Sequence, residues 1–86
     1  MARFRWNAWN VEHIGRHGVA PAEAESVVET GDRRRIEDEK YKAVGRGSGG
    51  RWLQVIYVFD PPGVVYVLHA RPLTGTEKRR ARRRKQ

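Results

Sequence analysis

The chain has 86 residues, a length that fits one domain and leaves little room for a deep, enclosed active site. It carries 18 lysines and arginines against 10 acidic residues, a formal net charge of +8, and it has no cysteine. The lack of cysteine excludes disulfides and thiolate metal sites. No segment has the length of a transmembrane span, and the N-terminus lacks a signal-peptide pattern, which favours the cytoplasm. We expect any site to lie on an open face or in a shallow cleft.

The positive charge is concentrated at the C-terminus. Residues 77–86 hold seven basic side chains and one acid, so residues 1–76 (11 basic against 9 acidic) carry a net charge of only +2. We interpret residues 1–76 as a single globular domain and residues 77–86 as a basic helix or tail. Such a segment attracts polyanions in a salt-dependent way, or it is only a solvated helix.

The N-terminal residues favour a short strand followed by a helix. Phe4 and Trp6 alternate with arginines, which predicts a strand that ends at Asn7, a residue type that caps helices well. From residue 8 onward, Trp9 and Ile14 can share the apolar stripe of a helix. We expect Trp6 and Trp9 to lie in the core and not to stack on bases, because a domain this small needs large residues inside.

A second helix follows. Gly18 is placed to end the first helix, Pro21 suits the first turn of the next, and Gly31 suits its end. The pattern then changes to strands, which we predict at 33–38, 41–46, 51–60 and 64–71. Thr74 or Thr76 can cap a last, basic helix that begins near Glu77.

This order predicts an α+β domain, with an N-terminal strand and two helices packed on an antiparallel sheet of three to four strands. Alternation places Leu53, Val55, Tyr57 and Phe59 toward the core. On the last strand the same alternation gives Val65, Val67, His69 and Arg71 one shared face. If the register holds, the uncovered face of the sheet displays Lys40, Lys42, Arg46, Gln54, His69 and Arg71.

His69 and Arg71 form the most informative pair of side chains. Residues two apart on a strand share a face, so both can meet one substrate. A proton-transfer group beside a fixed cation suits a phosphodiester, which indicates RNA or DNA as the ligand. In RNA, His69 can serve as general acid or base, Arg71 can bind the phosphate, and Lys40 or Arg46 can add charge. The alternative is that His69 is packed at a strand end and Arg71 pairs with Glu77.

The order of elements, together with the motifs FRW, EHIGRHGV, AVGRGSGGRWLQVIY and VLHARPLTGTEKRR, resembles the BrnT family of type II toxins. The most specific matches lie at 16–19, 45–57 and 70–77. The resemblance implies a small RelE-like domain, RNA cleavage that needs no metal or other cofactor, and pairing with a ribbon-helix-helix antitoxin. It also implies site roles for Arg71, Glu77, His17 and Lys40. His69 is proposed from this chain's own residues, because the family typically reads R-I-I-S-A-R where this chain has YVLHAR.

The remaining candidates follow from charge and spacing. His13 and His17 are four residues apart, which permits only a two-point grip on a metal, so we expect no metal site. Beyond the catalytic candidates we predict an RNA-binding set of Lys42, Arg46, Arg51, His17, Arg79, Arg80 and Arg83.

The sequence leaves three functions open. One is a ribonuclease toxin held by its antitoxin, as a homodimer or as a heterotetramer with that partner. A second is a non-catalytic basic module that binds nucleic acid or protein. The third is a protein-interaction domain whose basic tail serves solubility only.

Overall fold

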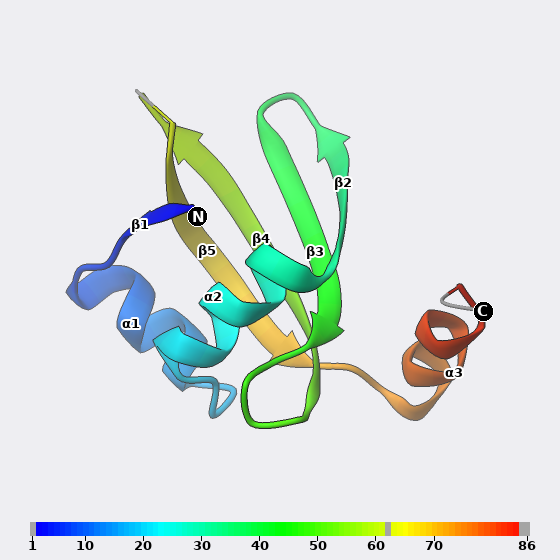
Figure 1. Ribbon diagram of the computed structural model, residues 1–86. Helices are drawn as coiled ribbons and strands as arrows, with labels where there is room; N and C mark the ends of the chain where they lie inside the picture. Colours follow the sequence, from blue (N-terminus) through cyan, green and yellow to red (C-terminus); the bar gives the residue numbers. More distant parts are fainter. Residues whose placement is uncertain (1, 62, 85–86) are drawn as a thin grey trace.

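The computed structural model describes residues 2–61 and 63–84. Its helices and strands (Figure 1) are, in chain order, β1 (Arg3–Arg5), α1 (Ala8–Gly15), α2 (Pro21–Thr30), β2 (Asp32–Glu37), β3 (Lys40–Arg46), β4 (Trp52–Asp60), β5 (Val64–Pro72) and α3 (Gly75–Arg84). Within the described ranges, no helix is long and apolar enough to cross a membrane.

All five strands belong to one sheet, in the order β1-β5-β4-β3-β2. β1 runs parallel to β5, with Arg3 opposite Val64 and Arg5 opposite Tyr66, and the other neighbouring strands are antiparallel. The α+β class is confirmed, but the sheet has five strands and not the expected three to four. The N-terminal strand hydrogen-bonds into the sheet, where we had expected it to pack on top, and so places Phe4 beside Val65 over the core.

Local sequence explains where the first helices begin. Asn7 is the N-cap of α1 and forms a capping box with Asn10. The Asn7 side chain accepts a hydrogen bond from the Asn10 backbone N–H, and the Asn10 side chain accepts one from the Asn7 backbone N–H. The buried Asn10 amide also donates to the Arg5 carbonyl, which ties α1 to β1. Pro21 occupies the first turn of α2, as predicted.

α2 lies close to β3 because glycines meet at the crossing. A Cβ on Gly31 would come within 2.6 Å of the Val27 carbonyl oxygen, and a Cβ on Gly45 would come within 2.9 Å of the Gly31 Cα. Neither position has room for a larger side chain. The approach fixes the helix layer against the sheet.

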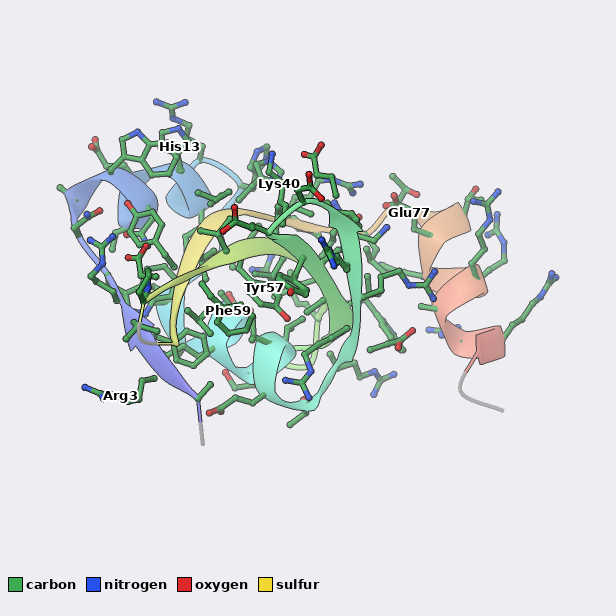
Figure 2. All side chains as sticks on the ribbon, turned by 90° about the horizontal axis from the view of Figure 1, so that it is seen from above. Arg3, His13, Lys40, Tyr57, Phe59 and Glu77 are labelled. Atoms are coloured by element: carbon green, nitrogen blue, oxygen red, sulfur yellow. The ribbon has the colours of Figure 1, made fainter. Side chains whose placement is uncertain are left out.

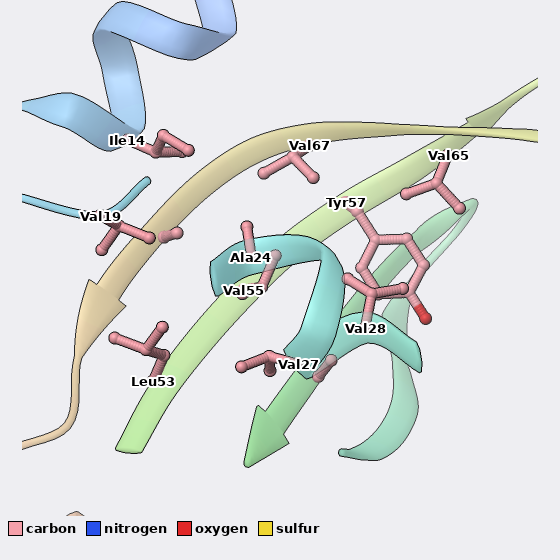
Figure 3. Close-up of a cluster of buried hydrophobic side chains, with 12 residues drawn as sticks. Ile14, Val19, Ala24, Val27, Val28, Leu53, Val55, Tyr57, Val65 and Val67 are labelled. Carbon is pink, nitrogen blue, oxygen red and sulfur yellow. The ribbon is translucent and has the colours of Figure 1, made fainter. Parts of the chain in front are cut away.

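α2 lies across one face of the sheet and α1 lies along its β5 edge, and together they bury the main core against the sheet (Figure 3). Its members are Ile14, Val19, Ala24, Val27, Val28, Ala43, Leu53, Val55, Tyr57, Val65, Val67 and Ala70. Burying each larger aliphatic side chain contributes about 1.5–3 kcal/mol. Trp6 packs against this cluster, in line with its predicted place.

Two residues expected in the core are exposed instead. Trp9 is 48% exposed and Phe59 is 46% exposed. Phe59 lies near the turn between β4 and β5, and the hairpin ends project beyond the two helices (Figure 1), so no helix covers it. Trp9 lies on the side of α1 that is turned from the core occupied by Ile14.

α3 packs at the opposite face of the sheet. Trp52, Leu73 and Ala81 form a second, smaller buried cluster, with Val44 packed against it. The helix begins at Gly75, two residues before the predicted start, because Thr74 and Glu77 form its cap. Apolar side chains on the last strand-to-helix connection and on α3 thus anchor a helix whose other side chains are mostly basic.

Candidate nucleic-acid interface

A β-bulge in β5 decides which residues reach the uncovered face. Tyr57 pairs with Val67 but the preceding residue of β4, Ile56, pairs with His69, so Leu68 is an extra residue in β5. Before the bulge, Val65 and Val67 point into the core, and after it His69 points to the other face together with Arg71. The prediction that Val65, Val67, His69 and Arg71 share one face is wrong. It assumed uninterrupted alternation along β5, and the extra residue Leu68 breaks that alternation.

The register places the basic side chains of neighbouring strands together. Ile56 lies between Lys42 on β3 and His69 on β5, and Gln54 lies between Val44 and Arg71. Lys42 and His69 are therefore two strands apart, about 10 Å between their Cα atoms. Viewed along the sheet in Figure 2, His13, Lys40 and Glu77 lie on one side of the curved sheet, and Tyr57 and Phe59 lie on the other. The strand register confirms that the residues predicted for the exposed face lie on one face of the sheet.

Arg71 is held by Glu77 in a bidentate pair. Nη1 and Nη2 of Arg71 donate to the two carboxylate oxygens at 2.8 Å each, and Nη1 also donates to the Pro72 carbonyl at 3.1 Å. The hydrogen bond to Glu77 raises the pKa of Arg71, and the bonds from Arg71 and the Thr74 backbone lower the pKa of Glu77 to about 2. Of the five N–H donors of the guanidinium, Nε–H and one Nη2–H make no hydrogen bond to residues 2–61 or 63–84 and can meet a phosphate oxygen.

His69 lies against His17 from the loop after α1. The two rings meet edge to face, with centroids 5.1 Å apart. Burial lowers the pKa of His69 below its usual value, and positive charge on His17, Arg71 and His13 lowers it further. A lowered pKa leaves the imidazole neutral near pH 7, the form that accepts a proton.

The other predicted contacts are placed less centrally. Lys40 Nζ is 2.9 Å from the Glu37 carboxylate at the far end of β3, and the Arg46 guanidinium lies 5.6 Å from the Trp52 ring centroid at the opposite end. Both are on the uncovered face, on either side of Lys42.

Arg51 lies on the helix-covered side of the sheet, apart from the other candidates. Its guanidinium donates to the Glu23 carboxylate and to the Gly18 carbonyl, which clamps the β3–β4 turn onto α2 and the loop before it. The hydrogen bond from Arg51 lowers the pKa of Glu23. The structure thus gives Arg51 a structural task that the sequence did not indicate.

A groove runs between α3 and the uncovered face. Its volume is about 430 Å³. Its polar lining consists of Thr30, Asp32, Lys42, Gln54, Glu77 and Arg80, and its apolar floor includes Val44, Trp52, Leu73 and Ala81. Arg79 and Arg83 are exposed on α3 beside it. This groove was not predicted from the sequence, although Leu73 just before the basic C-terminal segment and Ala81 within it stand out as apolar residues.

The structure also shows an aromatic row that the sequence pattern does not predict. Trp9 and His13 stack with ring centroids 3.7 Å apart, and Tyr66 lies nearly parallel to Trp9 at 6.3 Å. In the described ranges, no three His, Cys, Asp or Glu side chains gather as metal ligands. His13 Nδ1 is instead 2.8 Å from the Trp9 carbonyl oxygen.

Comparison with known proteins identifies the fold. No family model matches the chain, and no curated protein matches it in sequence. Among solved structures it is similar to the crystal structure of the Brucella abortus ribonuclease toxin BrnT, with a TM-score of 0.70 over 86% of this chain and 99% of that one. The two sequences are 17% identical, so the likeness concerns the fold alone. The chain therefore has the α+β fold of this toxin, with a five-stranded mixed sheet.

Proposed function

We propose that the protein is a metal-independent endoribonuclease and the toxin of a type II toxin–antitoxin pair. The observation that carries the proposal is the position of His69 beside Arg71 on the uncovered face, with Lys42 across the sheet. The likeness of the fold to that of a ribonuclease toxin supports the same reading.

The proposed reaction is attack of an RNA 2′-hydroxyl on the adjacent phosphorus, which breaks the bond to the 5′-oxygen. His69 in its neutral form accepts the 2′-hydroxyl proton, and its lowered pKa keeps this form abundant. The leaving 5′-oxygen takes a proton from solvent water, so the products are a 2′,3′-cyclic phosphate and a 5′-hydroxyl. The open N–H donors of Arg71 bind the phosphate oxygens and stabilise the extra negative charge as it develops. Lys42 adds a second positive charge. Glu77 acts as a positioning residue, because it fixes the orientation of the Arg71 guanidinium.

The test is cleavage of single-stranded RNA by purified protein in the presence of a chelator. We expect cleavage by the wild type and a loss of more than tenfold for Arg71→Ala, equivalent to about 1.4 kcal/mol or more of transition-state stabilisation. Arg33→Ala is the matched control, because Arg33 is an exposed arginine of the same sheet that lies opposite Ala43 and so faces away from the site. Equal activity of all three proteins at equal folded fraction would contradict the proposal.

A non-catalytic nucleic-acid-binding module is the second candidate function. The observation in its favour is that Glu77 already pairs with Arg71, one of the cations of the face. Salt-sensitive RNA binding without cleavage, with or without added divalent metal, would support this module over the enzyme.

The proposed antitoxin is a short ribbon-helix-helix protein that covers the basic face. Acidic side chains would speed its encounter with Lys40, Lys42, Arg46 and Arg71, and apolar anchors in the groove under α3 would supply affinity. Amide hydrogen exchange with the co-encoded partner should show protection at 40–46 and 64–71. Protection restricted to 8–30 would indicate inhibition from a distance. The mass of the free protein and of the complex will separate a homodimer from a heterotetramer.

A further inference from the structure

The uncovered side of the molecule has two halves of different chemistry. One half, over β3 and α3, displays lysine and arginine side chains. The other, over α1 and the first part of β5, displays the rings of Trp9, His13 and Tyr66. His69, in contact with His17, lies between the two halves. Proteins that bind single-stranded nucleic acid combine these same parts, a basic track for the phosphates and aromatic rings on which bases stack.

The aromatic half is held in place before any ligand binds. Trp9 and His13 are four residues apart on α1, and their rings stack at 3.7 Å with an interplanar angle of 25°. The His13 ring is fixed by the 2.8 Å hydrogen bond from Nδ1 to the Trp9 carbonyl. The Tyr66 hydroxyl donates to the Asn7 side chain at 3.1 Å, and the Arg5 guanidinium lies 4.3 Å from the Tyr66 ring centroid.

Trp9 nevertheless keeps a large apolar surface in water. It is 48% exposed, although His13 covers one side of the indole and Tyr66 lies nearly parallel to it. An exposed tryptophan among rings that are already oriented is suited to a flat aromatic ligand, which would cover it without further ordering.

We infer that Trp9 and Tyr66 form a stacking subsite for a nucleobase of single-stranded RNA, next to the phosphate that His69 and Arg71 engage. The inference rests on the proposed function, because the reacting phosphate sets the direction of the strand. Tyr66 and His69 are three residues apart in β5, at most about 10 Å between Cα atoms, so the stacked base belongs to a nucleotide close to the scissile bond. Bases paired inside a duplex cannot reach the rings, so the subsite selects single strands.

The experiment measures binding separately from cleavage. A short single-stranded RNA with 2′-O-methyl groups cannot be cleaved by 2′-hydroxyl attack, and its affinity is compared with that of a duplex of the same sequence. The proteins are the wild type, Trp9→Ala, Trp9→Phe and Phe59→Ala. Phe59 is the matched control, because it is an aromatic residue of similar exposure on the other side of the sheet.

Trp9→Ala should weaken single-strand binding about 5- to 150-fold, the equivalent of about 1 to 3 kcal/mol for one stacked base. Trp9→Phe should keep most of the affinity, and Phe59→Ala should bind like the wild type. The slope of affinity against salt concentration should be the same for Trp9→Ala and wild type, because stacking releases no counterions. Unchanged affinity of Trp9→Ala overturns the inference, and so does an equal loss in Phe59→Ala.

An abasic scan of the oligonucleotide gives a second arm that needs no variant. Removing one base near the scissile position should weaken binding to the wild type, and the same removal should cost nothing further in Trp9→Ala. Loss spread evenly over all positions would overturn the inference. Cleavage of unmodified RNA, assayed in parallel, keeps the two proposals apart. If the wild type binds RNA and does not cleave it, the proposed ribonuclease activity is refuted, and the binding data still test the stacking subsite. If the wild type binds no single-stranded RNA, the stacking subsite is refuted.

Discussion

Replacing Glu77 by glutamine tests how much the ion pair beneath the site contributes to stability. The carboxylate of Glu77 accepts two hydrogen bonds from Arg71 and one from the Thr74 backbone, all at 2.8 Å. Glutamine keeps an oxygen for the helix cap but loses the negative charge. Alanine at the same position loses both the charge and the cap.

Two estimates of the magnitude agree. A pKa lowered from 4.5 to about 2 corresponds to a little over 3 kcal/mol as an upper bound, and the Glu77 side chain is 33% exposed, so solvent screening reduces this to about 1–2 kcal/mol. A partly exposed bidentate pair contributes about 1 kcal/mol, and a side-chain cap contributes about another. We therefore expect Glu77→Gln to cost about 1 kcal/mol at neutral pH and Glu77→Ala to cost about 2 kcal/mol.

The assay is urea unfolding followed by tryptophan fluorescence, repeated from pH 7 to pH 2. Because the folded-state pKa of Glu77 is below its unfolded value, its contribution is complete above about pH 4.5 and is lost as the pH falls toward 2. The stability of wild type and Glu77→Gln should converge over this range. Glu29→Gln, at an exposed carboxylate of α2, is the control. A difference that persists unchanged at pH 2, or no difference at pH 7, would refute the ion-pair reasoning.

Three further outcomes are expected. The rate of RNA cleavage by the wild type should rise with pH through an apparent pKa below 6.5, and His69→Gln should abolish this rise; an unchanged profile would remove His69 from the mechanism. Replacing Arg79 and Arg83 by glutamine should lower the salt slope of RNA binding by up to about 0.7 for each lost phosphate contact, and an equal slope would show that α3 does not touch RNA. Ala81→Asp should destabilise the protein by about 2 kcal/mol or more and expose Trp52 to water, which is measurable as a red shift of its emission.

Local patterns were sufficient to predict most of the elements. Asn7 as a helix cap, Pro21 in a first turn and the turn residues at 47–50 each act through nearby backbone, so neighbouring residues alone determine them. Strand alternation likewise gave the faces of β3 and β4 correctly, because neither strand contains an irregularity in their pairing.

The errors arose where distant parts of the chain meet. β1 pairs in parallel with the edge of β5, a strand about 60 residues later in the chain, so the residues around β1 could not predict this pairing. The bulge at Leu68 depends on two opposing demands, since Val67 must enter the core while His69 stays out of it. Trp9 looked like a core residue because its spacing from Ile14 fits an apolar stripe, and only the placement of α1 at the border of the sheet shows that its ring stays outside.

The pairing of β1 with β5 has a consequence for the time at which activity appears during synthesis. Arg3 pairs with Val64, and His17 meets His69, so both the sheet edge and the site join segments that are far apart in the sequence. Contacts between residues so far apart in sequence form slowly, because a long loop must close before they are made. A chain that is still emerging from the ribosome has its first helices but not its last strand. We therefore expect the site to assemble only after β5 has been released, which leaves an interval in which a partner that is already present can bind first.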